Sequence, residues 1–276
     1  MLSISTEHTV IQRTTLFLSL TLITLGSILC FLGQLPYAVL IASGLLFICC
    51  YFYTITKGGL HYLLWGSVII LSVGIGLYRP ESFQYPLLFS VDSLHHNGKP
   101  FSLDLNWAKA VAGYGLLIWF YTRQKSLSLP KINPIHSTGM VILGVTVTLI
   151  AAIYLLNLEY QIKQPQYIWY FLLHNFFITC VVEEVFFRLV IQQKLETIAN
   201  KQFKMQITIA KLLALSLTTL LFVLVHQLNS LKLIVVYALA SLCYGLVFTF
   251  SRRLHLSIAM HFLVNAFHFS LLTYPL

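Results

Sequence analysis

Two glutamates and one arginine lie inside an apolar run of the sequence. Residues 180–191 read CVVEEVFFRLVI and place Glu183, Glu184 and Arg188 among valine, phenylalanine, leucine and isoleucine. A charged side chain in the middle of a membrane costs about 2.5–3.5 kcal/mol on insertion scales, so such residues usually face the interior of a helix bundle and indicate a site. Glu184 and Arg188 are four residues apart and can pair on one helix face. Glu183 points about 100° away from Glu184 and needs a partner from another helix.

Three more polar side chains occur in later apolar runs. His226 closes the run FVLVHQLN, and His261 and Asn265 lie four residues apart in AMHFLVNAF, hence on one helix face. Three helices can therefore present a carboxylate, an imidazole, and an imidazole with an amide to a common interior point. Such a set of groups can activate a water molecule and stabilise an oxyanion.

A structural interpretation competes with the catalytic one. Intramembrane histidines are more often interhelical hydrogen-bonding contacts than catalysts, and a Glu–Arg pair can serve packing alone. A purely structural pair, however, does not require a second glutamate beside it. We expect His174 and His268 to be packing or supporting residues. His174 should point to the helix face opposite Glu183 and so reach the site least, because nine residues are about two and a half turns.

The composition indicates that these side chains lie in a membrane protein. Of the 276 residues, 58% are hydrophobic and 9% are charged, and the mean hydropathy is +0.83, whereas soluble domains are about half apolar and a quarter charged. The net charge of +9 does not indicate nucleic-acid binding. The basic residues are scattered between the apolar runs, as in the cytoplasmic loops of membrane proteins, rather than gathered on one face.

The lengths of the apolar runs predict the helices, because a spanning helix needs about 20 apolar residues. The chain can be tiled with nine such runs, at residues 14–32, 36–56, 60–78, 107–121, 138–157, 167–192, 207–228, 231–250 and 256–273. We therefore expect an all-α fold, a polytopic transmembrane helix bundle of about eight or nine spans. The longest polar segment, 79–106, is expected to be an exposed loop, alone or with a short surface helix.

Lysine and arginine are unevenly divided between the expected loops. With a cytoplasmic N-terminus, the inside loops hold eleven of these residues and the outside loops hold four. Cytoplasmic loops carry such an excess. We expect a multi-pass integral membrane protein with its N-terminus in the cytoplasm, in the plasma membrane if the source is bacterial.

The five cysteines all lie in apolar runs, and their spacing is not that of a metal site. They are expected to be small buried side chains: Cys30, Cys49, Cys50, Cys180 and Cys243. Cys30 follows an apolar stretch, as a lipoprotein cysteine does, but SILC lacks the small residue expected just before it. Residues 14–32 are therefore interpreted as a retained first span.

The polar groups of the apolar runs resemble the motifs of a known family. EEVFFR, at residues 183–188, resembles the EExxxR motif of the CPBP family, the CAAX-protease and bacteriocin-processing family that is also called Abi. FVLVH, which ends at His226, resembles its FxxxH motif, and HFLVN, at residues 261–265, resembles its HxxxN motif. The three motifs occur in the family's order. The resemblance implies a protease core over 107–276, preceded by N-terminal transmembrane helices and a polar loop over 1–106.

The resemblance also implies roles for the residues. The family's fold is an all-α membrane bundle with its active site inside the bilayer, and its eukaryotic member is the type II CAAX prenyl protease. Glu183 would activate water, His226 would help to hold that water, and His261 with Asn265 would stabilise the oxyanion. The remaining pair of the first motif would support the site: Glu184 and Arg188.

The metal requirement has two interpretations. Glu183, His226 and His261 could form a His₂Glu zinc set with an open position for water. The sequence has no HExxH motif, however, and the three residues come from distant segments. A glutamate-and-histidine mechanism needs no metal, so we expect no cofactor, with zinc as the alternative.

One feature of the expected spans is inconsistent with a shared site. With straight spans, His226 lies near the outer end of its helix and His261 near the inner end of its own. The inconsistency disappears if the helix of Glu183 continues through 193–199, if the last helix begins near 251, or if helices tilt or break. The run QQKLETIANK permits the first of these.

The sequence thus supports two classes of function. The first is a glutamate-dependent intramembrane endopeptidase, whose partners would be the lipid bilayer and a peptide or protein substrate, such as one with a C-terminal sorting tag or a leader segment. The second is a non-catalytic immunity or partner-binding membrane protein, or a proton-coupled transporter of the same fold. The apolar runs hold no second set of carboxylates that could relay protons, which is evidence against transport.

Overall fold

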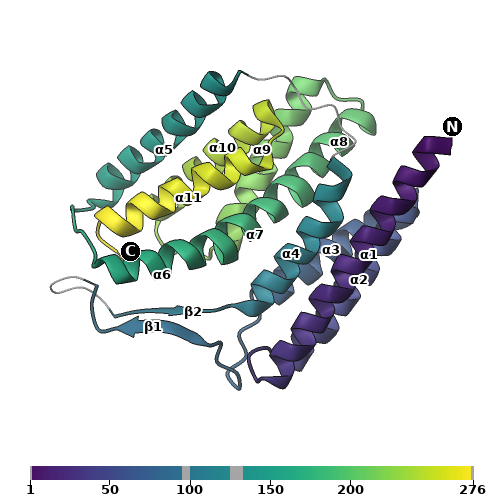
Figure 1. Cartoon of the computed structure of the whole chain (residues 1–276). Helices are drawn as coiled ribbons and strands as arrows, with labels where there is room; N and C mark the ends of the chain where they lie inside the picture. The colour runs from purple at the N-terminus through teal and green to yellow at the C-terminus, as the bar shows by residue number, and fades with distance from the viewer. Residues whose placement is uncertain (1, 95–99, 125–132, 275–276) are drawn as a thin grey trace. The chain divides into compact units, whose positions relative to one another are not determined.

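The computed structural model describes residues 2–94, 100–124 and 133–274, and Figure 1 traces the chain through them. Within this part of the chain, eight helices are long and apolar enough to cross a membrane. The expectation of an all-α, multi-pass membrane protein is therefore confirmed. Of the nine expected spans, only the helix that begins at Trp107 is not among the eight. Contacts divide the chain into two compact units, Met1–Pro86 with Asp104–Leu127, and Leu87–Leu103 with Ser128–Leu276.

The first unit is a group of four helices. They are α1 (Leu2–Phe31), α2 (Tyr37–Ile55), α3 (Gly59–Gly76) and α4 (Trp107–Gln124), and α4 packs against the other three. Asn106 joins α4 to α3, because its Oδ1 accepts a hydrogen bond from the backbone N–H of Lys109 at 2.9 Å and its Nδ2 donates to the carbonyl of Gly76 at 3.1 Å. The boundary at residue 106 between N-terminal helices and protease core stays a prediction.

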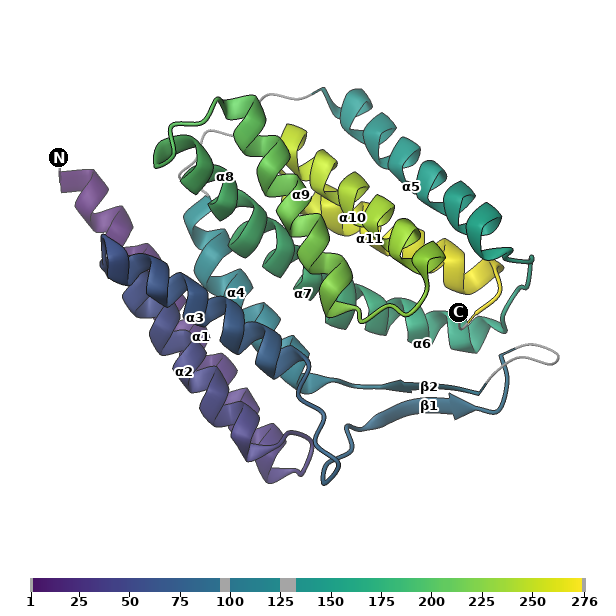
Figure 2. The same ribbon diagram turned by 180° about the vertical axis from the view of Figure 1, so that it is seen from behind.

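The second unit is a larger helix bundle. Its first helix is α5 (Pro134–Leu156), and its last three are α9 (Ile207–Val225), α10 (Leu231–Ser251) and α11 (Leu254–Leu271). Between them runs one long helical segment, made of α6 (Pro165–His174), η1 (Asn175–Cys180), α7 (Val181–Glu184), η2 (Val185–Gln192) and α8 (Gln193–Lys201). α5, α10 and α11 pack against one another (Figure 2).

The length of this segment explains how distant motifs come together. Glu183 lies at its middle, and the helix continues for about five more turns to Lys201. α9 packs against α8 and η2 and runs in the opposite direction. It has about the length of the segment from Glu183 to Lys201, so its C-terminal end, which His226 follows, lies beside Glu183. The first of the three solutions to the depth inconsistency is therefore the correct one. The last helix begins at Leu254, not near 251.

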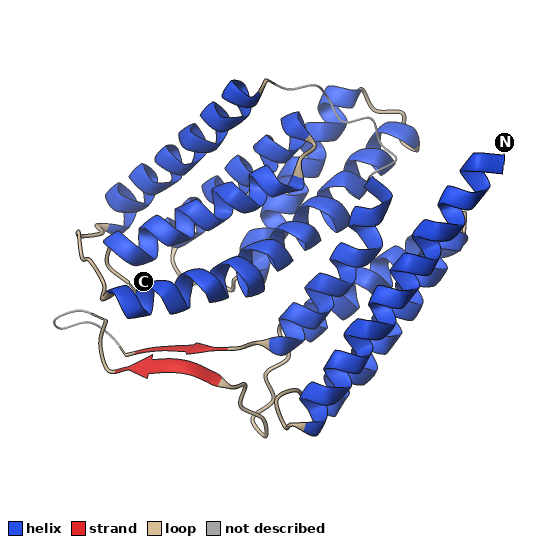
Figure 3. Ribbon diagram, in the orientation of Figure 1, coloured by secondary structure: helices blue, strands red, loops and turns tan. Residues whose placement is uncertain are grey.

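A β-hairpin occupies part of the polar segment 79–106, which corrects the expectation of a loop or short surface helix. Its strands are β1 (Leu87–Val91) and β2 (Phe101–Asp104) (Figure 3). Alternate residues of a strand share one face. On one face of the hairpin, aromatic rings from both strands pack on the helices. The Phe89 ring stacks 5.3 Å from that of Tyr167, and the Phe101 ring lies 5.9 Å from that of Phe269. This packing favours a strand over a solvated loop.

The connection between α5 and α6 is tied to the end of the chain. Tyr160 and Leu272 form an antiparallel bridge, and the Gln161 N–H donates to the carbonyl of Leu271 at 2.7 Å. The ammonium group of Lys163, which is 2% exposed, donates to the carbonyls of Gln161 and Leu272. Burial lowers the pKa of Lys163 to about 8. These bonds fix the start of α6 beside the end of α11.

Candidate active site

The pair of Glu184 and Arg188 forms as the spacing predicts. Arg188 Nε donates to Glu184 Oε2 at 2.7 Å, and both side chains are fully buried. The guanidinium also donates to Gln192 Oε1 at 2.8 Å. Gln192 in turn donates through Nε2 to the Gly245 carbonyl at 3.0 Å and to Thr249 Oγ1 at 2.8 Å. A chain of hydrogen bonds therefore connects the buried charges to α10, and Gln192 is a member that the motifs do not indicate.

Gly245 makes this close approach possible. A Cβ atom at this position would lie 2.4 Å from Leu215 Cδ1 and 2.7 Å from Arg188 Nη1. The Gly245→Ala substitution should therefore lower the free energy of unfolding by about 1–3 kcal/mol, because the overpacked network has to shift. Thermal unfolding of the purified protein measures the effect.

The matched control is Gly139→Ala in α5, where an added Cβ would meet nothing within 4 Å. This change should be neutral or stabilising by up to about 1 kcal/mol, because alanine has the higher helix propensity. Equal stability of the two variants would contradict the assignment of Gly245 to the network.

His261 is oriented by Glu184. Its Nδ1 lies 2.9 Å from Glu184 Oε1, and since the carboxylate accepts, the nitrogen donates. The ring stacks on Tyr244, with centroids 4.6 Å apart and an interplanar angle of 16°. The other nitrogen, Nε2, then faces Glu183, at 4.0 Å from Oε2. Glu184 thus has two roles: it pairs with Arg188, and it orients the His261 ring by accepting its Nδ1–H.

His226 is oriented in the same way by a backbone group. It follows the last residue of α9, and its Nδ1 donates to the carbonyl of Phe222 at 2.6 Å. Its Nε2 also lies 4.0 Å from Glu183 Oε2. In the FxxxH pattern, Phe222 therefore supplies a backbone acceptor as well as a ring that packs 4.4 Å from the imidazole.

Glu183 thus faces two imidazole nitrogens that both carry lone pairs when the rings are neutral. The separations of 4.0 Å are too long for direct hydrogen bonds. Two acceptors bridged by one water molecule lie about 4–5 Å apart, so the gap is suited to a water held between them. The Glu183 side chain is 12% exposed, so such a water would be largely shielded from bulk solvent.

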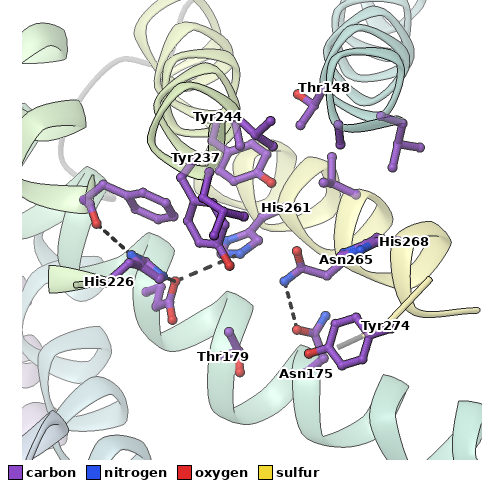
Figure 4. A pocket seen from close by; sticks show the side chains of 18 of the residues that line it. Thr148, Asn175, Thr179, His226, Tyr237, Tyr244, His261, Asn265, His268 and Tyr274 are labelled. Atoms are coloured by element: carbon purple, nitrogen blue, oxygen red, sulfur yellow. Dashed lines mark hydrogen bonds and ion pairs between the residues drawn. The ribbon is translucent and has the colours of Figure 1, made fainter. Parts of the chain in front are cut away.

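The amide of Asn265 is fixed by a residue that the motifs do not indicate. Asn265 Nδ2 donates to Asn175 Oδ1 at 3.0 Å, and Asn175 Nδ2 donates to Cys180 Sγ at 3.3 Å. Figure 4 shows the pair beside the pocket. Asn265 Nδ2 also lies 3.9 Å from Cys180 Sγ, a long contact to a weak acceptor. The sequence signal for Asn175 was a single amide in an apolar run.

Two π-helical segments flank Glu183 and change which side chains share a face. They are η1, from Asn175 to Cys180, and η2, from Val185 to Gln192. A π-helical turn holds more residues than an α-helical turn, and such segments are frequent at functional sites. The expectation that His174 points away from the site assumes a continuous α-helix and is wrong, because His174 lines the same pocket as Glu183.

The site lies in a cavity of about 500 Å³ within the second unit. Its walls come from α5, the α6–α7 segment, α9, α10, α11 and β2, and they include Leu103, Thr148, Thr179, Tyr237, Tyr244, His268 and Tyr274 (Figure 4). Burial raises the pKa of Tyr274 to about 12, so this phenol is neutral. All six predicted site residues come together: four line the cavity directly, and Glu184 and Arg188 lie behind them.

The donor atoms of the site have the chemistry of zinc ligands but not the spacing. Zinc with bonds of 2.0–2.1 Å has ligand atoms about 3.3 Å apart, whereas both Nε2 atoms lie 4.0 Å from Glu183 Oε2. In the described part of the chain, no group of three His, Cys, Asp or Glu residues is arranged to hold a metal ion. The arrangement therefore suits a bridging water better than a bound zinc ion.

Fold and site together define a multi-pass helical membrane protein with a buried glutamate–histidine site. Residues 165–267 match the model of the family described as type II CAAX prenyl endopeptidase Rce1-like. The matched residues run from α6 into α11 and contain all three motifs, so the resemblance found from the motifs is confirmed over this segment. At the family level, the match indicates a protease-like enzyme. No curated protein and no solved structure matches the chain.

Proposed function

We propose that the chain is a glutamate-dependent intramembrane endopeptidase. The observation that carries the proposal is the placement of Glu183 Oε2 at 4.0 Å from the Nε2 atoms of both His226 and His261. This arrangement lies in a cavity large enough for a peptide segment, and within the residues that match a prenyl endopeptidase family.

The proposed reaction begins with a water molecule between Glu183 and the two histidines. Glu183 takes a proton from the water, whose oxygen attacks the carbonyl carbon of the scissile peptide bond, and the carbonyl oxygen becomes an oxyanion. Hydrogen-bond donors around the cavity, including the Asn265 amide, stabilise this charge. The C–N bond then breaks, and the protonated Glu183 gives its proton to the leaving amine. One hydrogen of this water points to Glu183, and the other is donated to the Nε2 atom of one of the two neutral histidines, which holds the water in place. This proposal places His261 at the water, whereas the resemblance to the family implies a role for it at the oxyanion.

The substrate in this proposal is a peptide or protein tail at or within the membrane. The matched family is described as a CAAX prenyl endopeptidase, which makes a prenylated CAAX tail one candidate. A C-terminal sorting tag or a leader segment has the same requirement for an extended peptide near the bilayer. The cavity walls are mostly apolar, as a lipid-modified or membrane-embedded segment requires.

Comparison of membrane peptides identifies the substrate directly. Cells that contain the wild-type chain, the Glu183→Gln chain or no chain are compared by mass spectrometry of their membrane fraction. We expect at least one precursor to disappear, with matching products, only where the wild-type chain is present. Identical peptide sets in all three would refute the proposal and favour a non-catalytic role.

We further propose that the reaction needs no metal. The protein purified from membranes should contain less than stoichiometric zinc by elemental analysis, and a chelator should leave cleavage of the identified substrate unchanged. The reason is the 4.0 Å spacing of the donor atoms, which fits a bridging water. Stoichiometric zinc, together with activity that is lost on chelation and restored by zinc, would contradict this.

The orientation in the membrane is proposed from charge alone. Counted over nine spans, with α4 crossing the membrane, the inside loops hold eleven lysines and arginines if the N-terminus is cytoplasmic. A bacterial chain would lie in this orientation in the plasma membrane.

A further inference from the structure

The proposed function leaves the oxyanion short of hydrogen-bond donors. Both histidines use their Nδ1–H on fixed acceptors, His226 on the Phe222 carbonyl and His261 on Glu184. Their Nε2 atoms face Glu183, and in neutral rings these atoms accept hydrogen bonds. Of the motif residues that line the cavity, only Asn265 therefore offers an N–H to a developing negative charge, and its Nδ2 already donates to Asn175 Oδ1 at 3.0 Å and contacts Cys180 Sγ at 3.9 Å. Oxyanion sites usually combine at least two donors.

Tyr237 has the chemistry and the position to be the second donor. It stands on α10, two turns before Tyr244, and both line the cavity. Its ring centroid lies 5.0 Å from that of His226. Figure 4 shows its hydroxyl directed into the cavity, on the side where His226 and His261 lie. In the part of the chain that the structure describes, no hydrogen bond is made by this hydroxyl.

Other hydroxyls of the cavity are placed less suitably. The Tyr244 ring is stacked flat on His261 at 4.6 Å and supports that imidazole. Tyr274 packs against His268, two helical turns beyond His261 along α11. Thr148 extends from α5, on the opposite side of the cavity from His226 in Figure 4. Tyr237 is the phenol that contacts the ring of His226.

We propose that Tyr237 is a further catalytic residue, whose hydroxyl donates a hydrogen bond to the carbonyl oxygen of the scissile bond as it becomes an oxyanion. The phenol keeps its proton throughout. The water proton still moves to Glu183 and from there to the leaving amine, so the reaction remains balanced. This inference rests on the proposed endopeptidase function and adds a donor from α10, a helix that carries none of the three motifs.

The test is the Tyr237→Phe substitution, which removes the hydroxyl and keeps the ring that packs against His226. The probe is a quenched fluorescent peptide with a prenylated CAAX end or, if that is not cleaved, the precursor found by peptide mass spectrometry. We expect kcat to fall by about 10²–10³-fold, as for other single oxyanion donors, with KM changed less than about threefold. A phosphonate analogue of the same peptide, which mimics the tetrahedral intermediate, should bind Tyr237→Phe more weakly than wild type by a similar factor. The peptide itself, measured in the inactive Glu183→Gln background, should bind equally well with and without the added Tyr237→Phe change.

The control variant is Tyr154→Phe, at an exposed tyrosine of α5 outside the cavity. It should cleave at the wild-type rate, and Tyr237→Phe should unfold at the wild-type temperature. Suppose that the wild type cleaves the probe. If Tyr237→Phe then cleaves it equally well, or if its losses of kcat and analogue affinity only follow a loss of stability, the assignment of Tyr237 is overturned while the endopeptidase function stands. A wild type that cleaves neither probe overturns both.

Discussion

Replacing Glu183 with glutamine should reduce peptide cleavage by about 10⁴-fold or more, to below detection in a routine assay. A general base contributes typically 10²–10⁴-fold, and here the same carboxylate also returns the proton to the leaving amine. Glutamine keeps the shape and can still donate a hydrogen bond, but it cannot accept a proton from water. The measurement is the rate of cleavage of the identified substrate by purified protein in detergent or in vesicles.

The fold should survive this change, because Glu183 is not part of the ion pair of Glu184 and Arg188. Glu183→Gln should therefore insert, purify and unfold like the wild type. Glu159→Gln, at an exposed glutamate in the connection after α5, is the matched control and should cleave normally. Full activity of Glu183→Gln would exclude Glu183 as the base, whereas loss of folding would show that its role is structural.

The second large effect concerns stability. The Arg188→Met substitution should lower the free energy of unfolding by about 3–5 kcal/mol, because it leaves the fully buried Glu184 carboxylate without its counter-charge. The change also removes the donor to Gln192 Oε1 and the contact of the guanidinium with Ser241 of α10. Thermal or denaturant unfolding in detergent, and the yield of folded protein, measure the loss.

Two companion variants test the cause of that loss. Glu184→Gln combined with Arg188→Met should recover part of the stability, because the unpaired charge is gone while the glutamine oxygen can still accept from His261. Arg79→Met breaks the ion pair of Arg79 with Asp104, whose side chains are 52% and 34% exposed. That change should cost at most about 1 kcal/mol. If Arg188→Met were as stable as Arg79→Met, the buried pair of Glu184 and Arg188 would not stabilise the fold more than an exposed pair does.

Much of the site could be predicted because its polar side chains lie in apolar helices, where burying them costs free energy. A charge or an imidazole in an apolar run is unfavourable unless it is used, so Glu183, Glu184, Arg188, His226 and His261 are conspicuous in the sequence. Asn175 and Tyr237 are not, since an amide or a phenol in a helix is unremarkable without its neighbours. Gln192 and the carbonyl of Phe222 could not be identified from the sequence either, because their roles depend on hydrogen bonds that only the folded structure shows.

The number and type of the long helices, the membrane environment and the charged and imidazole groups of the site could be predicted from the sequence alone. These follow from apolar run length and the cost of buried charge, which are local properties. The tertiary structure alone decided their mutual placement: the continuation of the Glu183 helix to Lys201, the π-helical turns that bring His174 to the cavity, and the hairpin over 87–104. Which side chains share a helix face depends on which backbone carbonyl each N–H bonds, and this differs between α- and π-helical turns. The hairpin strands form because Phe89 and Phe101 pack on helices. Both are set by contacts between residues far apart in the chain, which no local pattern records.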